Sequence, residues 1–432
     1  MHQNVFRLKG KILDTSPRLG SIASRRDSRR RPNVVITGMG AVTPYGFGVD
    51  TLWDALLSGK RALRTVTGLS PKPLVGAPID FPVTSGITPK VLKQTDRFVH
   101  FALTAAQEAW NESGHSDTSV PSHRIGVVIG NAVGGLGTFR SGTLTYENGG
   151  RLSPFFVPAF IPNMAAARIA MEFSLHGMNL TVSTACAAGT DAIGVAADMI
   201  RMGRADVVMA GGAEALFIPE MVTGLMQTRA LSTVSDPELA CRPFDVDRSG
   251  MVMGEGAAIL ILEREDVAVK RGATPLARVL GYGSAGDGEH PAAPAVDGHG
   301  QKWAMEQTLH DANLSPEAVD YVNAHGTATL VGDRSEWTSI AQVVGTKCAV
   351  SSVKGSLGHL LGAAGAIEAV VGVKVLAHQV IPATVGCEQI DPDCPLDIVK
   401  SPRTASIKVA LSNSFGLGGQ NATIALGRWS EQ

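Results

Sequence analysis

The chain carries the same succession of features twice, and this repetition is the strongest constraint on its fold. In the first half, the β-branched run at residues 180–183 predicts a buried strand, and the apolar spacing over 189–203 predicts a helix behind it. In the second half, residues 319–326 predict a strand that ends at a polar turn, and residues 362–377 predict another helix of small residues. Such alternation favours mainly parallel strands covered by helices on both faces.

Length supports a chain with two similar halves. At 432 residues the chain exceeds the usual size of one hydrophobic core. Other apolar runs of strand character lie in both halves, at 34–38, 125–130, 206–212, 256–263, 410–413 and 420–427. We therefore expect three parts: an N-terminal extension at 1–32, an N-terminal half at 33–275 and a C-terminal half at 276–432.

The first 32 residues are set apart by their charge. Nine Arg and Lys residues lie there with only two acidic residues, Asp14 and Asp27. An organellar targeting peptide and a basic, flexible extension both fit this composition, and the flexible extension is the simpler interpretation.

Composition excludes several classes of protein. A net charge of −1 argues against nucleic acid as the main partner. The five cysteines are scattered without CxxC spacing, which favours the reducing cytoplasm over a disulfide scaffold or a zinc site. We find no apolar run near the ~18 residues that a membrane span needs, so no membrane contact is expected.

Cys186 lies at the expected junction between the first strand and its helix. Its sulfur would lie near the positive end of the helix, which favours the nucleophilic thiolate. The small neighbours Ala185, Ala187 and Ala188 leave room for a substrate. A small buried cysteine without chemistry is the alternative interpretation when the residue is considered alone.

Two histidines in the second half follow polar turns that are flanked by glycine. His325 lies in the segment 323–329, and His359 lies in the segment 351–365. Either histidine alone is more often a packed side chain. Together with a cysteine at a helix start, they suggest one shared site. The chain lacks HxxxH and CxxC spacing near them, so we expect no metal.

These segments resemble the elongating β-ketoacyl-[acyl-carrier-protein] synthases, the ketosynthase group of the thiolase superfamily. The resemblance covers residues 34–428. It rests on Thr184-Ala-Cys-Ala-Ala-Gly, Arg242-Pro-Phe-Asp, Met253-Gly-Glu-Gly, Asn323-Ala-His-Gly-Thr, Gly358-His-Leu-Leu-Gly-Ala-Ala-Gly and Ser412-Asn-Ser-Phe-Gly. It implies a duplicated thiolase-like α/β fold, layered α-β-α-β-α, with two mainly parallel mixed sheets.

The resemblance also implies a mechanism. Cys186 would attack an acyl thioester and hold the chain covalently, with the backbone N–H groups of Cys186 and Leu417 as the oxyanion hole. His325 and His359 would stabilise the enolate that forms when a malonyl thioester loses carbon dioxide. The product is a fatty-acid chain lengthened by decarboxylative Claisen condensation.

Supporting residues follow from the same resemblance. Lys354 would orient His359 through Glu336, and Thr327 and Thr329 would bind the pantetheine arm. No free cofactor is expected, because the substrates are carried on the phosphopantetheine of acyl carrier protein.

The resemblance implies a homodimer whose acyl channel runs toward the partner subunit. Substrate-lining positions correspond to Val133, Met221, Leu225 and Phe415, with Phe156 and Ile161 reaching in from the partner. A basic rim for the acidic carrier protein corresponds to Lys90, Lys93, Arg151 and Arg229. Met221 stands where the long-chain pattern has glycine, so the channel is reshaped.

One departure and three alternatives stay open. Leu417 stands where the family has a gating Phe, which puts the gate and the acyl selectivity in doubt. A type II polyketide ketosynthase shares every catalytic residue and pairs with a chain-length factor in a heterodimer. A chain-length factor itself lacks the nucleophile, and a thiolase needs a second cysteine that residues 412–421 do not contain.

Overall fold

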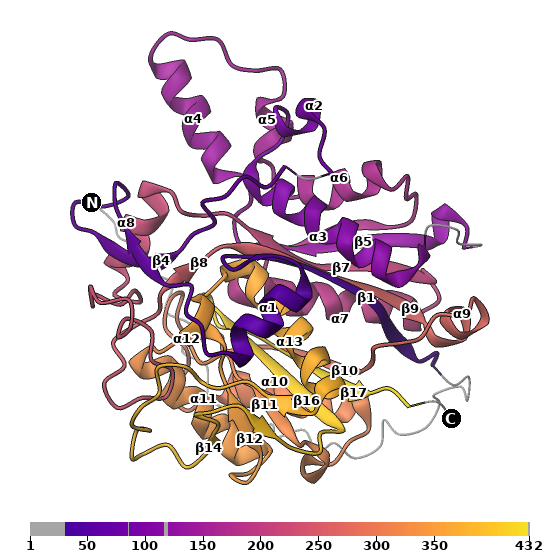
Figure 1. Cartoon of the computed structure of the whole chain (residues 1–432), viewed down its shortest axis with the longest axis vertical. Coiled ribbons are helices and arrows are strands. Elements are labelled where there is room, and N and C mark those ends of the chain that lie inside the picture. Colours follow the sequence, from indigo (N-terminus) through magenta and orange to yellow (C-terminus); the bar gives the residue numbers. More distant parts are fainter. Residues whose placement is uncertain (1–30, 85, 116–119, 431–432) are drawn as a thin grey trace, which may run out of the picture. The chain divides into compact units, whose positions relative to one another are not determined.

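The computed structural model describes most of the chain (Figure 1), namely residues 31–84, 86–115 and 120–430. The predicted basic extension lies outside the described residues, except for its last two. Residues 32–432 form one compact unit. The predicted halves 33–275 and 276–432 are therefore parts of one body, and the boundary between them stays a prediction.

A mixed sheet of twelve strands runs through this unit. Its order is β14-β12-β11-β16-β17-β10-β1-β9-β7-β5-β6, and β2 pairs with β1. The strands are β1 (Val34–Thr43), β2 (Gly46–Phe47), β5 (Ile125–Gly130), β6 (Asn179–Val182), β7 (Val207–Glu214), β9 (Gly256–Arg264), β10 (Ala277–Gly286), β11 (Tyr321–Asn323), β12 (Ala349–Ser351), β14 (Asp397–Ile398), β16 (Val409–Gly416) and β17 (Gln420–Arg428). Smaller sheets join β3 (Arg64–Val66), β4 (Leu74–Ala77) and β8 (Met253–Gly254), and β13 (Val380–Ile381) with β15 (Arg403–Thr404).

The two sheets that the sequence predicts are joined into this one. β1 and β10 pair antiparallel, with Val34 opposite Val279 and Ile36 opposite Ala277, so each half of the sheet continues into the other. Parallel pairs lie in the outer parts, whereas the central strands β9, β1, β10 and β17 pair antiparallel. A short turn joins β16 to β17, and such a connection makes neighbouring strands antiparallel. The mixed α/β fold is confirmed, with a more antiparallel centre than predicted.

Helices form three layers around the two halves of the sheet (Figure 1). α3 and α6 cover the N-terminal half, α10 and α11 cover the C-terminal half, and α7 and α13 lie between them. The helices are α1 (Val49–Leu57), α2 (Pro89–Leu92), α3 (Arg97–Ser113), α4 (Leu136–Glu147), α5 (Phe156–Phe160), α6 (Met164–Glu172), α7 (Ala188–Arg201), α8 (Pro219–Gln227), α9 (Glu265–Lys270), α10 (His299–Ala312), α11 (Leu330–Val343), α12 (Lys354–Leu357) and α13 (Ala364–His378). Short 3₁₀ turns are η2 (Ser122–Arg124), η3 (Ala185–Ala187), η4 (Pro316–Ala318) and η5 (Leu361–Ala363).

One apolar helix corrects the expectation about membrane-length runs. Residues Leu361–His378 are long and apolar enough to cross a membrane, although the sequence analysis found no such run. Most of this segment is buried inside the protein, because α13 lies between the two halves of the sheet. Its apolar character is that of a core helix.

Glycines let the first turns of α7 and α13 touch. A Cβ added to Gly189 would lie 2.7 Å from the backbone nitrogen of Ala366, and one added to Gly365 would lie 2.1 Å from Thr190 Oγ1. Neither distance leaves room for a side chain. The two helix starts therefore meet backbone to backbone.

We predict that Gly189→Ala lowers the free energy of unfolding by about 1–3 kcal/mol, because the added methyl group overpacks the crossing. The control is Gly224→Ala in α8, where a Cβ meets nothing within 4 Å. That change is expected to be neutral or to stabilise by up to ~1 kcal/mol, as alanine favours helix. Urea unfolding measures both variants, and equal stabilities would contradict the tight crossing.

Candidate active site

Cys186 lies in a strained turn between β6 and α7. Cys186 belongs to the 3₁₀ turn η3, and this turn directly precedes α7. The predicted position between strand and helix is therefore confirmed. Ala185 has φ of 50°, a left-handed conformation that is unfavourable for a residue with a Cβ. Cys186 itself is 7% exposed.

The turn before α13 repeats this geometry. Leu361 has φ of 52°, and η5 leads into α13 as η3 leads into α7. His359 lies two residues before Leu361, and two hydrogen bonds hold its backbone. The His359 N–H donates to the carbonyl of Val252, and the His359 carbonyl accepts from the N–H of Gly254. The N–H of Leu361 donates to His359 Nδ1 over 3.2 Å. Because Nδ1 accepts, the neutral ring carries its hydrogen on Nε2.

His325 comes from the end of β11 and meets the other two groups. The sulfur of Cys186, one ring nitrogen of His325 and one ring nitrogen of His359 all lie within 4.8 Å of one another. The two imidazole rings are 5.0 Å apart between centroids and nearly perpendicular. Nδ1 of His325 and Nε2 of His359 are buried, and neither has a hydrogen-bond partner among the residues that the structure describes. Both rings therefore keep a polar atom free for a substrate.

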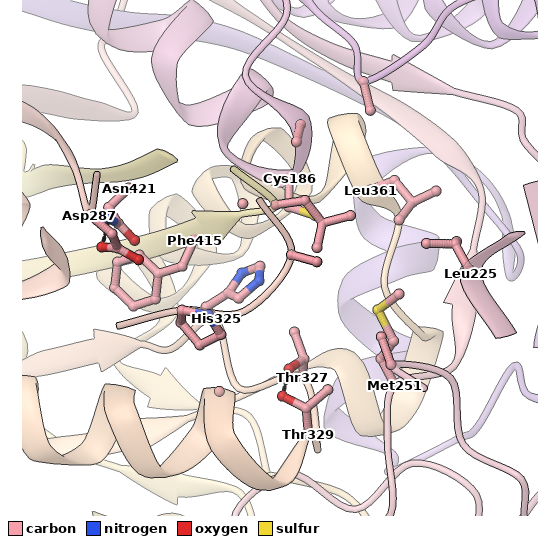
Figure 2. Close-up of a pocket in the computed structure, with 18 of the residues that line it drawn as sticks. Cys186, Leu225, Met251, Asp287, His325, Thr327, Thr329, Leu361, Phe415 and Asn421 are labelled. Carbon is pink, nitrogen blue, oxygen red and sulfur yellow. Dashed lines mark hydrogen bonds between the residues drawn. The ribbon is translucent and has the colours of Figure 1, made fainter. Parts of the chain in front are cut away.

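A cavity of about 860 Å³, including its open mouth, lies over Cys186 and His325 (Figure 2). His359, although close to both, is not one of its lining residues. In Figure 2, the side chains of Cys186 and His325 lie between apolar residues such as Leu225 on one side and the polar pair Asp287 and Asn421 on the other. The predicted residues that line the cavity are Cys186, Met221, Leu225, His325, Thr327, Thr329, Phe415 and Leu417. The cavity thus has one apolar and one polar end.

Val133, which was expected to line the acyl channel, does not line this cavity. Phe156 and Ile161, which are predicted to reach into the partner's channel, also lie outside it, and Phe156 lines a second cavity of about 650 Å³ between α4 and α5. A Cβ on Gly142 would lie 2.1 Å from the Phe156 ring, so this ring packs on α4 of its own subunit.

The predicted basic rim divides between the two cavities. Lys93 and Arg151 line the second cavity, and Lys90 is exposed on α2 beside it. Arg229 is exposed after α8, next to Ala230 of the first cavity.

Sequence reasoning missed several residues of the site. Met251, Leu361, Asp287, Gln301 and Asn421 also line the cavity. Asn421 could have been predicted, because it follows a glycine-rich turn, as His325 and His359 follow turns that are flanked by glycine. The sequence around Met251 has no feature that indicates a site residue.

The predicted partner of Lys354 is wrong. Lys354 Nζ donates to Glu368 of α13, and both side chains are buried. Glu336 instead accepts the backbone N–H groups of His325, at 2.7 Å, and Gly326, at 2.6 Å. Glu336 therefore shapes the His325 turn, because α11 directs its carboxylate to that backbone. Glu368 is the one acidic residue in the apolar helix α13. A single carboxylate in an apolar helix could have been predicted to pair with a buried cation.

Burial keeps Cys186, His325 and His359 neutral. Burial raises the pKa of the Cys186 thiol from 9.0 to about 11, although a hydrogen bond from the Leu417 N–H and the charge of Lys354 lower it. The helix end was expected to favour the thiolate, but loss of solvent has the larger effect and raises the pKa of the thiol. Burial, followed by the charge of Lys354, holds the pKa of both His325 and His359 well below 6.5. Both histidines are thus neutral.

Cys186, His325 and His359 also form a possible set of metal ligands among the described residues. The sequence spacing gave no sign of it, because the three come from distant segments. A metal would need the thiolate form of Cys186, which the raised pKa of its thiol opposes.

The site thus places a buried, protonated cysteine beside two neutral histidines. Residues 31–268 match the beta-ketoacyl synthase N-terminal domain, and residues 276–388 match the C-terminal domain. The chain belongs to the β-ketoacyl synthase family.

Named relatives cover almost the whole chain. The 3-oxoacyl-[acyl-carrier-protein] synthase 2 of Coxiella burnetii is 40% identical over 91% of this chain and 98% of its own length. The same enzyme of Staphylococcus aureus (strain COL) is also 40% identical, over 90% of this chain and 97% of its own length.

Solved structures agree with this assignment. A beta-ketoacyl synthase from Burkholderia phymatum has a TM-score of 0.86 at 33% identity, over 92% of this chain and all of that one. The ishigamide ketosynthase/chain length factor has a TM-score of 0.86 at 31% identity, over 93% of this chain and all of that one.

We predict that the alkylation rate of Cys186 by iodoacetamide rises about tenfold per pH unit between about pH 7 and 9, because only the thiolate reacts. A thiol with a pKa of about 11 stays mostly protonated throughout this range. Peptide mass mapping separates Cys186 from the other four cysteines. A rate that levels off below about pH 8 would reveal a thiolate at rest and contradict the account.

Proposed function

We propose that this β-ketoacyl synthase lengthens fatty acyl chains by decarboxylative condensation with malonyl-acyl carrier protein. The observation that carries the proposal is the meeting of Cys186 with two neutral imidazoles beside the cavity that Cys186 and His325 line. A polyketide pathway is the second candidate, since a type II polyketide ketosynthase solved with its acyl-carrier protein has a TM-score of 0.84 at 29% identity.

The first step transfers the acyl chain to Cys186. The sulfur of Cys186 attacks the thioester carbonyl, the carbon–sulfur bond to the carrier's pantetheine breaks, and the proton of the thiol leaves on the pantetheine sulfur. The N–H of Leu417 points at the Cys186 sulfur, and a Cβ on Gly416 would lie 3.2 Å from the Cys186 nitrogen. This closeness supports the two backbone N–H groups as the oxyanion hole.

The second step uses the histidines. A neutral imidazole can donate a hydrogen bond to the oxygen of the malonyl thioester as carbon dioxide leaves, without giving up its proton. The resulting carbanion attacks the acyl-Cys186 carbonyl, the cysteine sulfur leaves as a thiolate, and a proton from water restores the thiol. Lys354 acts as a positioning residue here, since its charge helps to hold the pKa of His325 and His359 low. Glu368 balances that charge in the core.

The polar end of the cavity suits the pantetheine arm. The hydroxyl groups of Thr327 and Thr329 lie 3.0 Å apart on its wall. The substrates bring their own phosphopantetheine, so the scheme includes no free cofactor. We place the reaction in the cytoplasm, which suits five cysteines that are all free.

We propose a homodimer as the working state. β6 lies at the edge of the sheet, and its Leu180 is exposed, as are Phe139, Phe155 and Val157 around α4 and α5. An unpaired strand edge beside apolar side chains favours pairing with another chain. Phe156 and Ile161 lie outside the cavity of their own subunit, as residues lent to a partner would. A chain-length-factor homologue is the alternative occupant, since the ketosynthase ApeO was solved with one.

The experiment that separates the two pathways is intact-mass analysis. The protein is incubated with saturated acyl-carrier substrates and with β-ketoacyl-carrier substrates, and adducts on Cys186 are counted. Loading by saturated chains alone supports fatty-acid elongation. Loading by β-ketoacyl chains alone would replace it with the polyketide function.

We predict that Cys186→Ala abolishes acyl loading and keeps malonyl-carrier decarboxylation, because the histidines remain. The control is Cys348→Ala, a buried cysteine away from the cavity, which should load as the wild type does. Intact mass and carbon dioxide release measure the two steps. An acyl adduct on the Cys186→Ala protein would contradict the role of the nucleophile.

We predict that Arg229→Glu raises KM for carrier-bound substrates and weakens their salt dependence, since the carrier protein is acidic. The control is Lys347→Glu, an exposed charge before β12, at the strand end opposite the site. Steady-state kinetics at two ionic strengths measure both variants. Unchanged kinetics for Arg229→Glu would reject this docking surface.

We predict that Met221→Gly shifts acyl loading toward longer chains, because Met221 fills part of the apolar end of the cavity. The shift should be graded, since room for one methylene is worth ~1–3 kcal/mol of discrimination. The control is Met226→Gly on the same helix, whose side chain does not line the cavity. Cys186 loading is measured over a chain-length series. If the folded Met221→Gly protein has the same chain-length profile as the wild type, Met221 does not line the acyl channel.

A further inference from the structure

A buried carboxylate that the proposed chemistry does not use lies behind the nucleophile turn. Asp191 belongs to the first turn of α7 and is 3% exposed. Its Oδ2 accepts a hydrogen bond from Thr184 Oγ1 over 2.5 Å, and its Oδ1 accepts one from the Tyr282 hydroxyl over 2.6 Å. The two bonds reach opposite sides of one carboxylate.

The first bond spans the strained part of the turn. Thr184 directly precedes Ala185, whose φ of 50° is unfavourable for alanine. Such a conformation persists only where the surroundings hold it in place. The hydrogen bond from Thr184 to Asp191 joins the residue before the turn to the first turn of α7. It therefore links the two ends of the segment that contains Ala185 and Cys186.

The second bond anchors this closure to the other half of the molecule. Tyr282 belongs to β10, and its ring packs against the backbone of α7 at Gly194, where an added Cβ would lie 2.2 Å from the ring. A side chain at position 194 would therefore collide with the Tyr282 ring, and glycine leaves the space that the ring occupies. Asp191 is held from β10 while it holds Thr184.

Asp191 has a geometric role, separate from the electrostatics of the thiol. Burial raises the pKa of Cys186, and the charges that modify it belong to Lys354, Glu214 and Glu368. Asp191 directs its two oxygens to hydroxyl groups on either side of the turn.

We propose that Asp191 is a positioning residue that, through Thr184 and Tyr282, holds the left-handed nucleophile turn so that the sulfur of Cys186 faces the acyl carbonyl. This inference rests on the proposed role of Cys186 as the nucleophile. A displaced sulfur would slow acyl transfer, while the histidine step would continue.

The test compares three variants with the wild type. Thr184→Val keeps the shape of the side chain and removes the donor. Thr184→Ser restores the donor. Asp191→Asn keeps the size of the side chain and replaces one accepting oxygen by an NH₂ group. Each protein is assayed for acylation of Cys186 by intact mass and peptide mapping, and separately for malonyl-carrier decarboxylation and thermal stability.

The acylation rate should fall about ten- to hundredfold in Thr184→Val and Asp191→Asn, and stay within about threefold of the wild type in Thr184→Ser. Decarboxylation and KM for the carrier should hardly change, which a general loss of structure would not allow. If Thr184→Val does not fold, the contrast between Asp191→Asn and Thr184→Ser carries the same test.

Three different outcomes would overturn the inference. If the wild type is acylated on Cys186 and the folded Thr184→Val and Asp191→Asn proteins are acylated equally fast, Asp191 does not position the turn. If acylation and decarboxylation fall together, Asp191 is only structural. A wild type that takes no acyl group on Cys186 would instead remove the proposed function, and this inference with it.

Discussion

The site depends on the contact between the first turns of α7 and α13. Gly189 and Gly365 bring the two helix starts together, because neither contact leaves room for a Cβ. Each helix follows a 3₁₀ turn that begins with a left-handed residue, Ala185 in one and Leu361 in the other. One turn carries the cysteine, and the other fixes the tautomer of His359. The duplication therefore makes the site, because each half supplies a different group from the same kind of turn.

Burial determines the charge state of the groups assembled there. Loss of solvent raises the pKa of the thiol and lowers the pKa of both imidazoles, so all three side chains are neutral. Lys354 strengthens this state at the histidines, since its positive charge opposes a second positive charge nearby. Neutral rings with a free polar atom suit hydrogen bonding to a developing enolate. A thiol without charge needs the oxyanion hole and a well-aimed sulfur more than a resting thiolate would.

Much of the fold and the core of the site could be predicted from the sequence. Cys186 lies among small residues at a strand-to-helix junction, and His325 and His359 follow turns that are flanked by glycine. The alternation of strands with helices predicted the α/β class. The pairing of β1 with β10 depends on tertiary packing, so the union of the two sheets could not be predicted. The partner of Lys354 was missed because Glu336 and Glu368 are both acidic residues near the site in sequence. Only their directions in space tell them apart, toward the His325 backbone and toward Lys354.

The central claim is that the crossing of α7 and α13 holds two neutral histidines, one of fixed tautomer, beside a protonated cysteine. Long-range ¹H–¹⁵N spectra of the ¹⁵N-histidine-labelled protein test it most directly, with His325→Gln and His359→Gln for assignment. The account predicts that both rings stay neutral from about pH 8 down to about pH 6, below the ordinary pKa of histidine. It also predicts that His359 carries its hydrogen on Nε2. A ring that titrates near pH 6.5, or His359 protonated on Nδ1, would contradict it.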